Sequence, residues 1–166
     1  MFFKNLQYIF LFITTISIIL LIYLWYDDYN FKNVPLSNNY ISMIKQKEAN
    51  LKRLIYKNFN ISRDIPIIVS DKMKASRFGM AVYSKDNSIK IYLNKNRFKE
   101  NASYMINDVL PHEYAHAIMF VFKDFAQENS GHTKKWQNIC KKLNGLRCSR
   151  FVNNKDILIE KTNIFK

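Results

Sequence analysis

The longest run of hydrophobic positions lies near the start of the chain. Residues 8–26, YIFLFITTISIILLIYLWY, form nineteen positions without a charge. At about 1.5 Å per residue such a helix is roughly 28 Å long, close to the hydrocarbon thickness of a bilayer. A cleavable signal peptide would have a shorter core ending in small residues, whereas the first alanine of this chain is Ala49. The pattern therefore predicts a single membrane-spanning anchor.

Behind this run the periodicity becomes that of a small mixed domain. Residues 40–58 repeat hydrophobic positions at helical spacing between lysines, which predicts an amphipathic helix. Residues 65–70 form a short apolar run with β-branched side chains, as in a buried strand. Residues 79–84 and 88–94 flank a turn, and the second of them alternates apolar and polar positions. We expect these two stretches to form a hairpin.

Two further helices are predicted in the second half. Residues 103–125 are apolar over most of a helical circumference, which indicates a central, buried helix. Pro111 lies inside it, so either the helix kinks there or a new helix begins with Pro111 in its first turn. Residues 132–145 repeat apolar positions at helical spacing and end in Gly145, the expected C-terminal cap. The same spacing makes Cys140 a core residue before any ligand role.

This order of elements predicts an α+β domain behind an anchor. We expect residues 1–27 to be the transmembrane anchor, 28–37 a short polar stalk and 38–166 one domain. Within the tail, DILIE at 156–160 is a candidate strand.

Charges on either side of the apolar run indicate its orientation. Lys4 and the amino terminus precede the run, while Asp27 and Asp28 follow it, with Lys32 close by. Basic residues favour the cytoplasmic side. We therefore expect a single-pass membrane protein with a cytoplasmic N-terminus and the domain outside.

The chain is strongly basic. It carries 26 Lys and Arg against 13 Asp and Glu, a formal charge of +13. Such a field favours nucleic acid, anionic lipid headgroups or acidic proteins as partners. The basic residues are scattered without a dense arm, so the charge could equally serve to keep the surface solvated. The oligomeric state is unknown from sequence.

All three histidines lie between residues 112 and 132, in the stretch PHEYAHAIMFVFKDFAQENSGH. His112 and His116 are four residues apart on a predicted helix, so both imidazoles project from one face. His132 follows after a loop and is the candidate third ligand. Three protein ligands and one open position are typical of catalytic zinc. Glu113, beside the first ligand, is then the candidate general base, taking a proton from a water molecule.

Other interpretations of this cluster remain open at this stage. An HExxH string can occur by chance, although a His–Glu pair without a metal is costly to bury. A structural metal site would need a fourth protein ligand, for which Cys140 or Cys148 could serve. Asp108, one turn before His112, could support that histidine, but a solvated or capping aspartate is the simpler interpretation. Tyr114 is one guess for a group that stabilises an oxyanion.

These motifs carry a resemblance. LPHEYAHAIMFVF, GHTKKWQ and a helix ending in KKLNG resemble the SprT-like (Spartan-type) metalloprotease domain, as do SRFGMAVY and IKIYLN upstream. The resemblance covers about residues 38–145. It implies a minimal zincin, a small sheet packed on the HExxH helix, with Zn²⁺ held by His112, His116 and His132 and with Glu113 catalytic. Members of that family often add a zinc ribbon and act on DNA-bound proteins, but two cysteines cannot build the ribbon and a membrane span is atypical.

The sequence thus predicts a membrane-anchored zinc-dependent endopeptidase that hydrolyses a protein substrate. The alternative is a basic, membrane-tethered module that binds DNA or the cell envelope and whose metal is structural. A toxin or accessory protein of a secretion system would use the same chemistry on another substrate.

Glu128 and Glu160 are poorer third ligands than His132, because neither lies in a convincing helical pattern.

Overall fold

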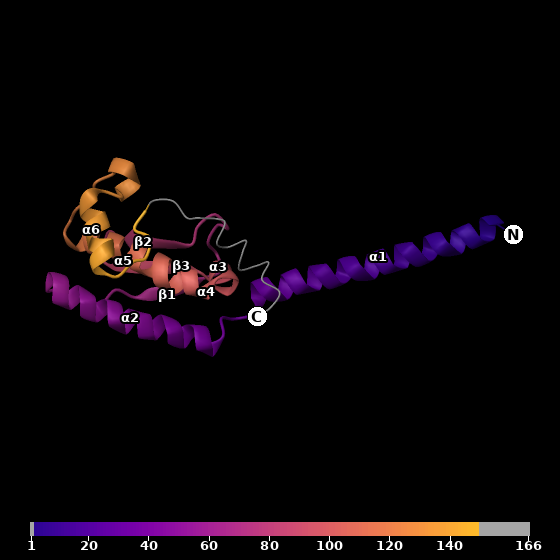
Figure 1. Cartoon of the computed structure of the whole chain (residues 1–166), viewed down its shortest axis with the longest axis horizontal. Helices are drawn as coiled ribbons and strands as arrows, with labels where there is room; N and C mark the ends of the chain where they lie inside the picture. The colour runs from indigo at the N-terminus through magenta and orange to yellow at the C-terminus, as the bar shows by residue number, and fades with distance from the viewer. Residues whose placement is uncertain (1, 150–166) are drawn as a thin grey trace. The chain divides into compact units, whose positions relative to one another are not determined.

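A computed structural model of the chain describes residues 2–149 and divides it into two compact units, Met1–Pro35 and Leu36–Lys166. The first unit is one long helix, α1 (Phe2–Asn33) (Figure 1). It includes the whole apolar run and continues through residues 28–33, which were expected to belong to the stalk. Its apolar side chains from Leu6 onward are exposed, and within the described residues it is the one helix long and apolar enough to cross a membrane. The candidate strand at 156–160 lies outside the described residues.

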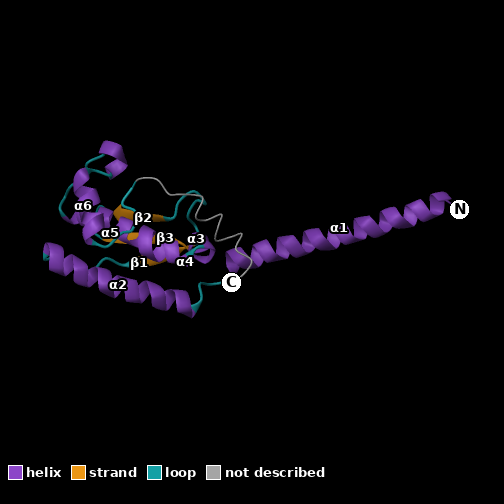
Figure 2. Cartoon of the chain, in the orientation of Figure 1, coloured by secondary structure: helices purple, strands orange, loops and turns teal. Residues whose placement is uncertain are grey.

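The second unit is an α+β domain with a three-stranded sheet (Figure 2). Its strands are β1 (Ile67–Ser70), β2 (Gly79–Tyr83) and β3 (Ile89–Asn94), in the order β1-β3-β2. β3 runs parallel to β1 and antiparallel to β2, so the predicted hairpin is confirmed. The alternation in β3 is confirmed as well, because Ile89, Ile91 and Leu93 are buried while the residues between them are half-buried. β2 is therefore an edge strand among the described residues.

The three predicted helices occur in the predicted order, and α3 (Lys95–Glu100) was not predicted. The α-helices described in this unit are α2 (Asn38–Phe59), α3, α4 (Ala102–Tyr104), α5 (Leu110–Val121) and α6 (Lys134–Lys142). A π-helical turn, η1 (Met105–Val109), joins α4 to α5, and a 3₁₀ turn, η2 (Glu128–Gly131), precedes α6. The amphipathic helix predicted at 40–58 is thus confirmed as α2, which buries Ile44, Leu51 and Ile55.

Helix α5 is the centre of the domain, as the sequence predicts. It packs against β2, β3 and α6, and residues such as Leu110, Ala115 and Ile118 are fully buried. It ends four residues earlier than the apolar pattern does. Lys123 takes a left-handed conformation with φ 56°, and the Asp124 N–H donates to the Met119 carbonyl, which closes the helix. Residues 122–131 are thereby free to fold back as a loop beside α5.

Helix α6 also ends differently from the prediction. Asn144, with φ 56°, is the left-handed residue, while the Gly145 N–H donates to the Cys140 carbonyl. The expected cap at Gly145 is wrong by one residue. Gly145 is instead needed for space, because a Cβ there would lie 2.6 Å from the Cys140 Sγ.

Candidate metal centre

His112 and His116 are presented by the first turns of α5. The chain stays helical through this point, since Val109 and Leu110 both keep helical φ and ψ, and Pro111 lies in the first turn of the α-helical part. A proline ring would collide with the carbonyl four residues earlier in a continuous α-helix. The wider π-turn η1 relieves that conflict, because the Leu110 N–H donates to Met105, five residues back. Pro111 thus lies in a first α-helical turn, as the second alternative holds, but no separate helix begins there, because the π-helical turn leads straight into α5.

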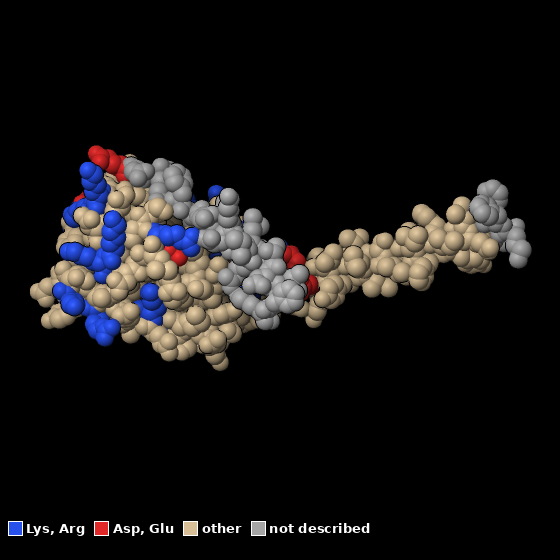
Figure 3. Space-filling model, viewed as in Figure 1, with Lys and Arg blue, Asp and Glu red and all other residues tan. Residues whose placement is uncertain are grey.

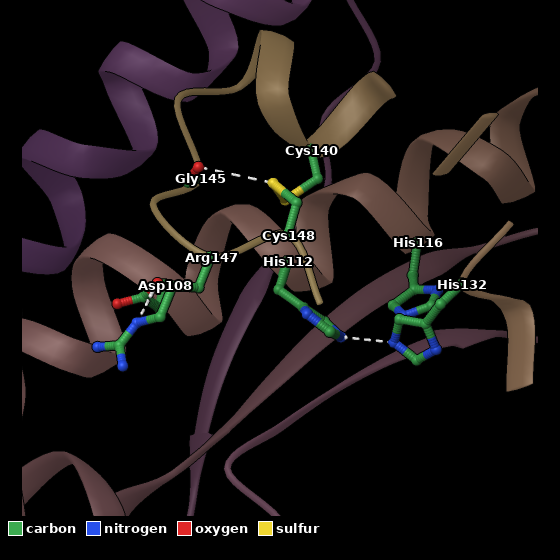
Figure 4. The surroundings of a disulfide bond; sticks show 8 residues. All are labelled: Asp108, His112, His116, His132, Cys140, Gly145, Arg147 and Cys148. Atoms are coloured by element: carbon green, nitrogen blue, oxygen red, sulfur yellow. Dashed lines mark hydrogen bonds and ion pairs between the residues drawn. A yellow bond between two sulfur atoms is a disulfide. The ribbon is translucent and has the colours of Figure 1, made fainter. Parts of the chain in front are cut away.

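His132 reaches the same point from the loop before α6. Gly131 takes a positive φ of 82°, and the Thr133 side chain accepts the Trp136 N–H as the N-cap of α6. The Nε2 atom of His132 lies 3.1 Å from that of His112 and 3.2 Å from that of His116. Figure 4 shows the three imidazoles meeting beside α5. The structure thus brings together the three histidines that the sequence singled out.

Trp136 holds the three rings from behind. It is fully buried, and its ring centroid lies 4.6, 5.1 and 4.5 Å from those of His112, His116 and His132. One rigid side chain therefore contacts all three rings. Because His132 directly precedes Thr133, the N-cap of α6, the start of this helix positions both the third imidazole and its support.

Two of the imidazoles are neutral at physiological pH. Burial, with the neighbouring imidazoles adding to it, lowers the pKa of His112 to about 3. Burial and His132 lower the pKa of His116 to about 4. A neutral imidazole has the free lone pair that a metal needs. Protons therefore compete little with a metal for these two residues above about pH 5.

The Nε2 separations fit a metal ion. Ligands arranged tetrahedrally at about 2.0–2.1 Å from zinc lie about 3.3 Å from one another. The three histidines offer ligand atoms within 4.8 Å of one another, and no fourth Cys, Asp or Glu joins that group among the described residues. The site can accordingly hold a metal ion through three imidazoles.

Glu113 lies with its carboxylate against strand β2. It is 7% exposed, and its Oε2 accepts the Ala81 N–H at 2.9 Å. Burial raises the pKa of Glu113 to about 8, although the Ala81 hydrogen bond works in the opposite direction. Gly79 leaves room for this side chain, since a Cβ there would lie 2.7 Å from the Glu113 Cγ. The carboxyl group is thus held in place and able to exchange a proton near neutral pH.

The two cysteines form a disulfide, Cys140–Cys148. Neither offers a thiolate, so the proposed fourth ligand from Cys140 or Cys148 is wrong. The expectation that Cys140 belongs to the core is confirmed, since it is fully buried. Sequence reasoning missed the bond itself. Its signal was a pair of cysteines eight residues apart, around a glycine just after a helix end.

Two other sequence interpretations are corrected. Asp108 is 5% exposed rather than solvated, and its Oδ1 lies 3.5 Å from the Arg147 Nε, an ion pair visible in Figure 4. Tyr114 is 1% exposed, and its hydroxyl donates to the Ile65 carbonyl. That contact engages the hydroxyl with the segment before β1, so Tyr114 is unsuited to stabilising an oxyanion. No residue for that role emerges among the described residues.

Basic side chains outnumber acidic ones on the domain. Residues 36–149 include twenty Lys and Arg against nine Asp and Glu. Figure 3 shows basic side chains gathered over the end of the domain where α6 lies, and Lys134, Lys135, Lys141 and Lys142 are exposed there. The excess charge is thus carried by the folded domain.

Comparison with known proteins supports this arrangement. The model described as the SprT-like family matches residues 44–158, more than two thirds of the chain. The match includes β1–β3, the three histidines and Glu113. No curated protein and no solved structure gave a significant match.

Proposed function

The chain belongs to the SprT-like family, and we propose on this basis that it is a membrane-anchored, zinc-dependent endopeptidase. The observation that carries the proposal is the convergence of three imidazoles beside a buried, positioned carboxyl group. An HExxH helix packed on a small sheet is the arrangement of a minimal zincin, and α5 with β1–β3 corresponds to it. In that arrangement the substrate strand lies along the edge strand, here β2.

Zinc suits this donor set. Three imidazoles with Nε2 atoms about one tetrahedral edge apart leave one position open. A structural site would use four protein ligands, and the disulfide removes the cysteines as candidates for the fourth. Bound there, zinc would polarise the scissile carbonyl and lower the pKa of a water molecule towards about 7.

Glu113 moves the proton in this proposal. Its carboxylate accepts a proton from the attacking water while the oxygen of that water bonds to the carbonyl carbon. The same carboxyl group then delivers the proton to the amide nitrogen as the C–N bond breaks, so the amine leaves neutral. A pKa of about 8 before a cation binds suits a group that must both accept and release a proton. The Ala81 N–H keeps one oxygen fixed on β2 throughout.

The membrane placement rests on three features. Helix α1 has the length and composition of a membrane span, and the positive-inside tendency favours a cytoplasmic N-terminus. The Cys140–Cys148 disulfide supports the same orientation, because such bonds persist in oxidising compartments and are rare in the cytosol. An outward domain would direct the basic surface towards anionic lipids or envelope polymers rather than towards nucleic acid.

Exchange of Glu113→Gln tests the mechanism. The variant keeps the shape of the side chain and the acceptor for the Ala81 N–H but cannot take up the proton. We expect it to retain one zinc per chain and to lose proteolysis of an unfolded protein by at least about a hundredfold. Undiminished proteolysis in this variant, with metal content measured in the same preparation, would exclude the mechanism.

A further inference from the structure

A cavity of about 490 Å³ opens directly beside the metal centre. Its walls come from the end of α5 and from the loop that folds back beside it, and they include His116, Met119, Phe120, Phe125, Ala126 and Gly131. His116 is one of the three imidazoles, and Gly131 adjoins another. A polypeptide whose scissile bond lies at the metal would therefore have a side chain within reach of this cavity.

The outer wall of the cavity is formed by Phe125, whose ring packs against other aromatic rings. The Phe125 ring lies 5.8 Å from that of Phe120 and 5.1 Å from that of Tyr83, on strand β2. Lys123 donates to the Tyr83 hydroxyl and lies over its ring at 4.9 Å. The three rings thus support one another, so the wall has a defined shape although Phe125 is 49% exposed.

Asp124 is the one carboxylate among the described residues that line the cavity, and it already has partners. Asp124 accepts the Ala126 N–H through Oδ1, and its Oδ2 lies 2.9 Å from the Lys135 Nζ. These contacts pair the negative charge of Asp124 with Lys135 and hold the loop in place. Because the charge of Asp124 is paired with Lys135, neither a cationic nor an anionic side chain gains from it, and burying an unpaired charge is costly. The cavity therefore favours an uncharged guest.

We propose that this cavity is the specificity pocket of the site and takes a large, uncharged apolar side chain next to the scissile bond. The proposal rests on the proposed function, because it assumes that a polypeptide is bound at the metal. The volume lies within the range of about 300–1,000 Å³ for ligand pockets and accommodates an aromatic side chain. Burial of such a side chain strengthens binding by about 10- to 100-fold over a methyl group.

The test uses two peptide hydroxamates that differ in one side chain, benzyl or methyl, at the position beside the metal-binding group. Their dissociation constants are measured by calorimetry on the zinc-loaded, full-length protein in nanodiscs. We expect the benzyl compound to bind at least about tenfold more tightly. Phe125→Ala, which removes the outer wall, should reduce that preference severalfold. Equal affinities, or a preference that Phe125→Ala leaves intact, would overturn the proposal.

Phe122→Ala is the matched control. Phe122 is 43% exposed and lies three residues away, but it lines a separate groove with Phe59 and Lys142. Its exchange should leave the preference unchanged. If Phe125→Ala fails to fold, Ala126→Leu at the exposed rim is the second variant. It narrows the cavity and should weaken binding of the benzyl compound, which lowers the preference. Both readouts measure binding, not cleavage. A protein that binds the hydroxamates but cleaves no peptide would therefore refute the proteolytic function, while the binding preference would still show whether the cavity takes the apolar side chain. If neither hydroxamate binds, the pocket proposal is overturned.

Discussion

Gly79 on β2 lies so close to Glu113 on α5 that no side chain fits between them. A Cβ at position 79 would lie 2.7 Å from the Glu113 Cγ and 2.9 Å from its Oε1. Ala81, two residues further along β2, donates its N–H to the other carboxylate oxygen, Oε2. One edge strand therefore both makes room for the Glu113 carboxyl group and orients it.

Gly79→Ala should accordingly impair catalysis without removing the metal. The added methyl group displaces the Glu113 side chain or pushes β2 away from α5, and misplacement by about 1 Å can cost up to about a hundredfold in rate. We expect a ten- to hundredfold lower kcat with unchanged zinc content, measured by peptide cleavage and metal analysis. Ala81→Gly is the control, since it keeps the N–H. Normal kcat in Gly79→Ala would show that Glu113 is not positioned in this way.

The stability of the metal-free protein should depend on pH through Glu113. Its folded pKa of about 8 lies above the ordinary value of 4.5. The unfolded chain therefore loses this proton first, so the contribution of Glu113 to stability is present below about pH 4.5 and is lost as the pH rises through 8. The loss is on the order of a few kcal/mol.

Chemical denaturation of wild type and Glu113→Gln, both with chelator, isolates this effect. Glutamine does not titrate, and the contribution of the histidines is common to both proteins. The stability difference should grow in favour of the variant between pH 5 and pH 8. A difference that is constant over this range would contradict the buried, protonated carboxyl group.

Removal of zinc should destabilise the domain. A ligand that binds only the folded state stabilises it by about 2.7 kcal/mol at a free concentration one hundred times Kd. We expect chelation to lower Tm and added zinc to restore it. His132→Ala should abolish most of this response, because it leaves two imidazoles. Asn138→Ala, exposed on α6, should respond as the wild type does; an equal response in His132→Ala would exclude that residue as a ligand.

The disulfide should contribute to stability but not to metal binding. Closing a loop of about nine residues is worth about 2–3 kcal/mol in the chain-entropy description. Cys140→Ala combined with Cys148→Ala should unfold at lower denaturant concentration and still bind one zinc. Loss of zinc from this double variant, with the fold intact, would revive a structural site that includes a thiolate.

The same bond reports the side of the membrane. In intact bacterial cells we expect both thiols to be blocked from alkylation unless a reductant is added, because an outward domain is oxidised. A reporter active only outside the cytoplasm, fused after Lys166, gives an independent reading. Free thiols together with an inactive reporter would place the domain inside and restore nucleic acid as the partner of its basic surface.

Local patterns were sufficient to predict most of the elements and the three histidines that converge. The hairpin, the amphipathic helix and the buried helix follow from periodicities of two and 3.6 residues. His112 and His116 follow from a spacing of four on that helix. His132 could be chosen as the third histidine of the cluster by counting alone, since the chain has no other histidine. Each of these depends on neighbours within a few turns, where secondary structure fixes direction.

Tertiary structure decided what joins distant segments. The Glu113–Ala81 bond spans 32 residues, and the Asp108–Arg147 pair joins η1 to the loop after α6. Whether Cys140 is a ligand, a free thiol or a disulfide depends on where Cys148 comes to lie. The cavity exists because α5 ends at Val121, so that its loop folds back beside His116. No periodicity encodes such contacts, because they follow from how the whole chain packs its core and pairs its buried polar groups.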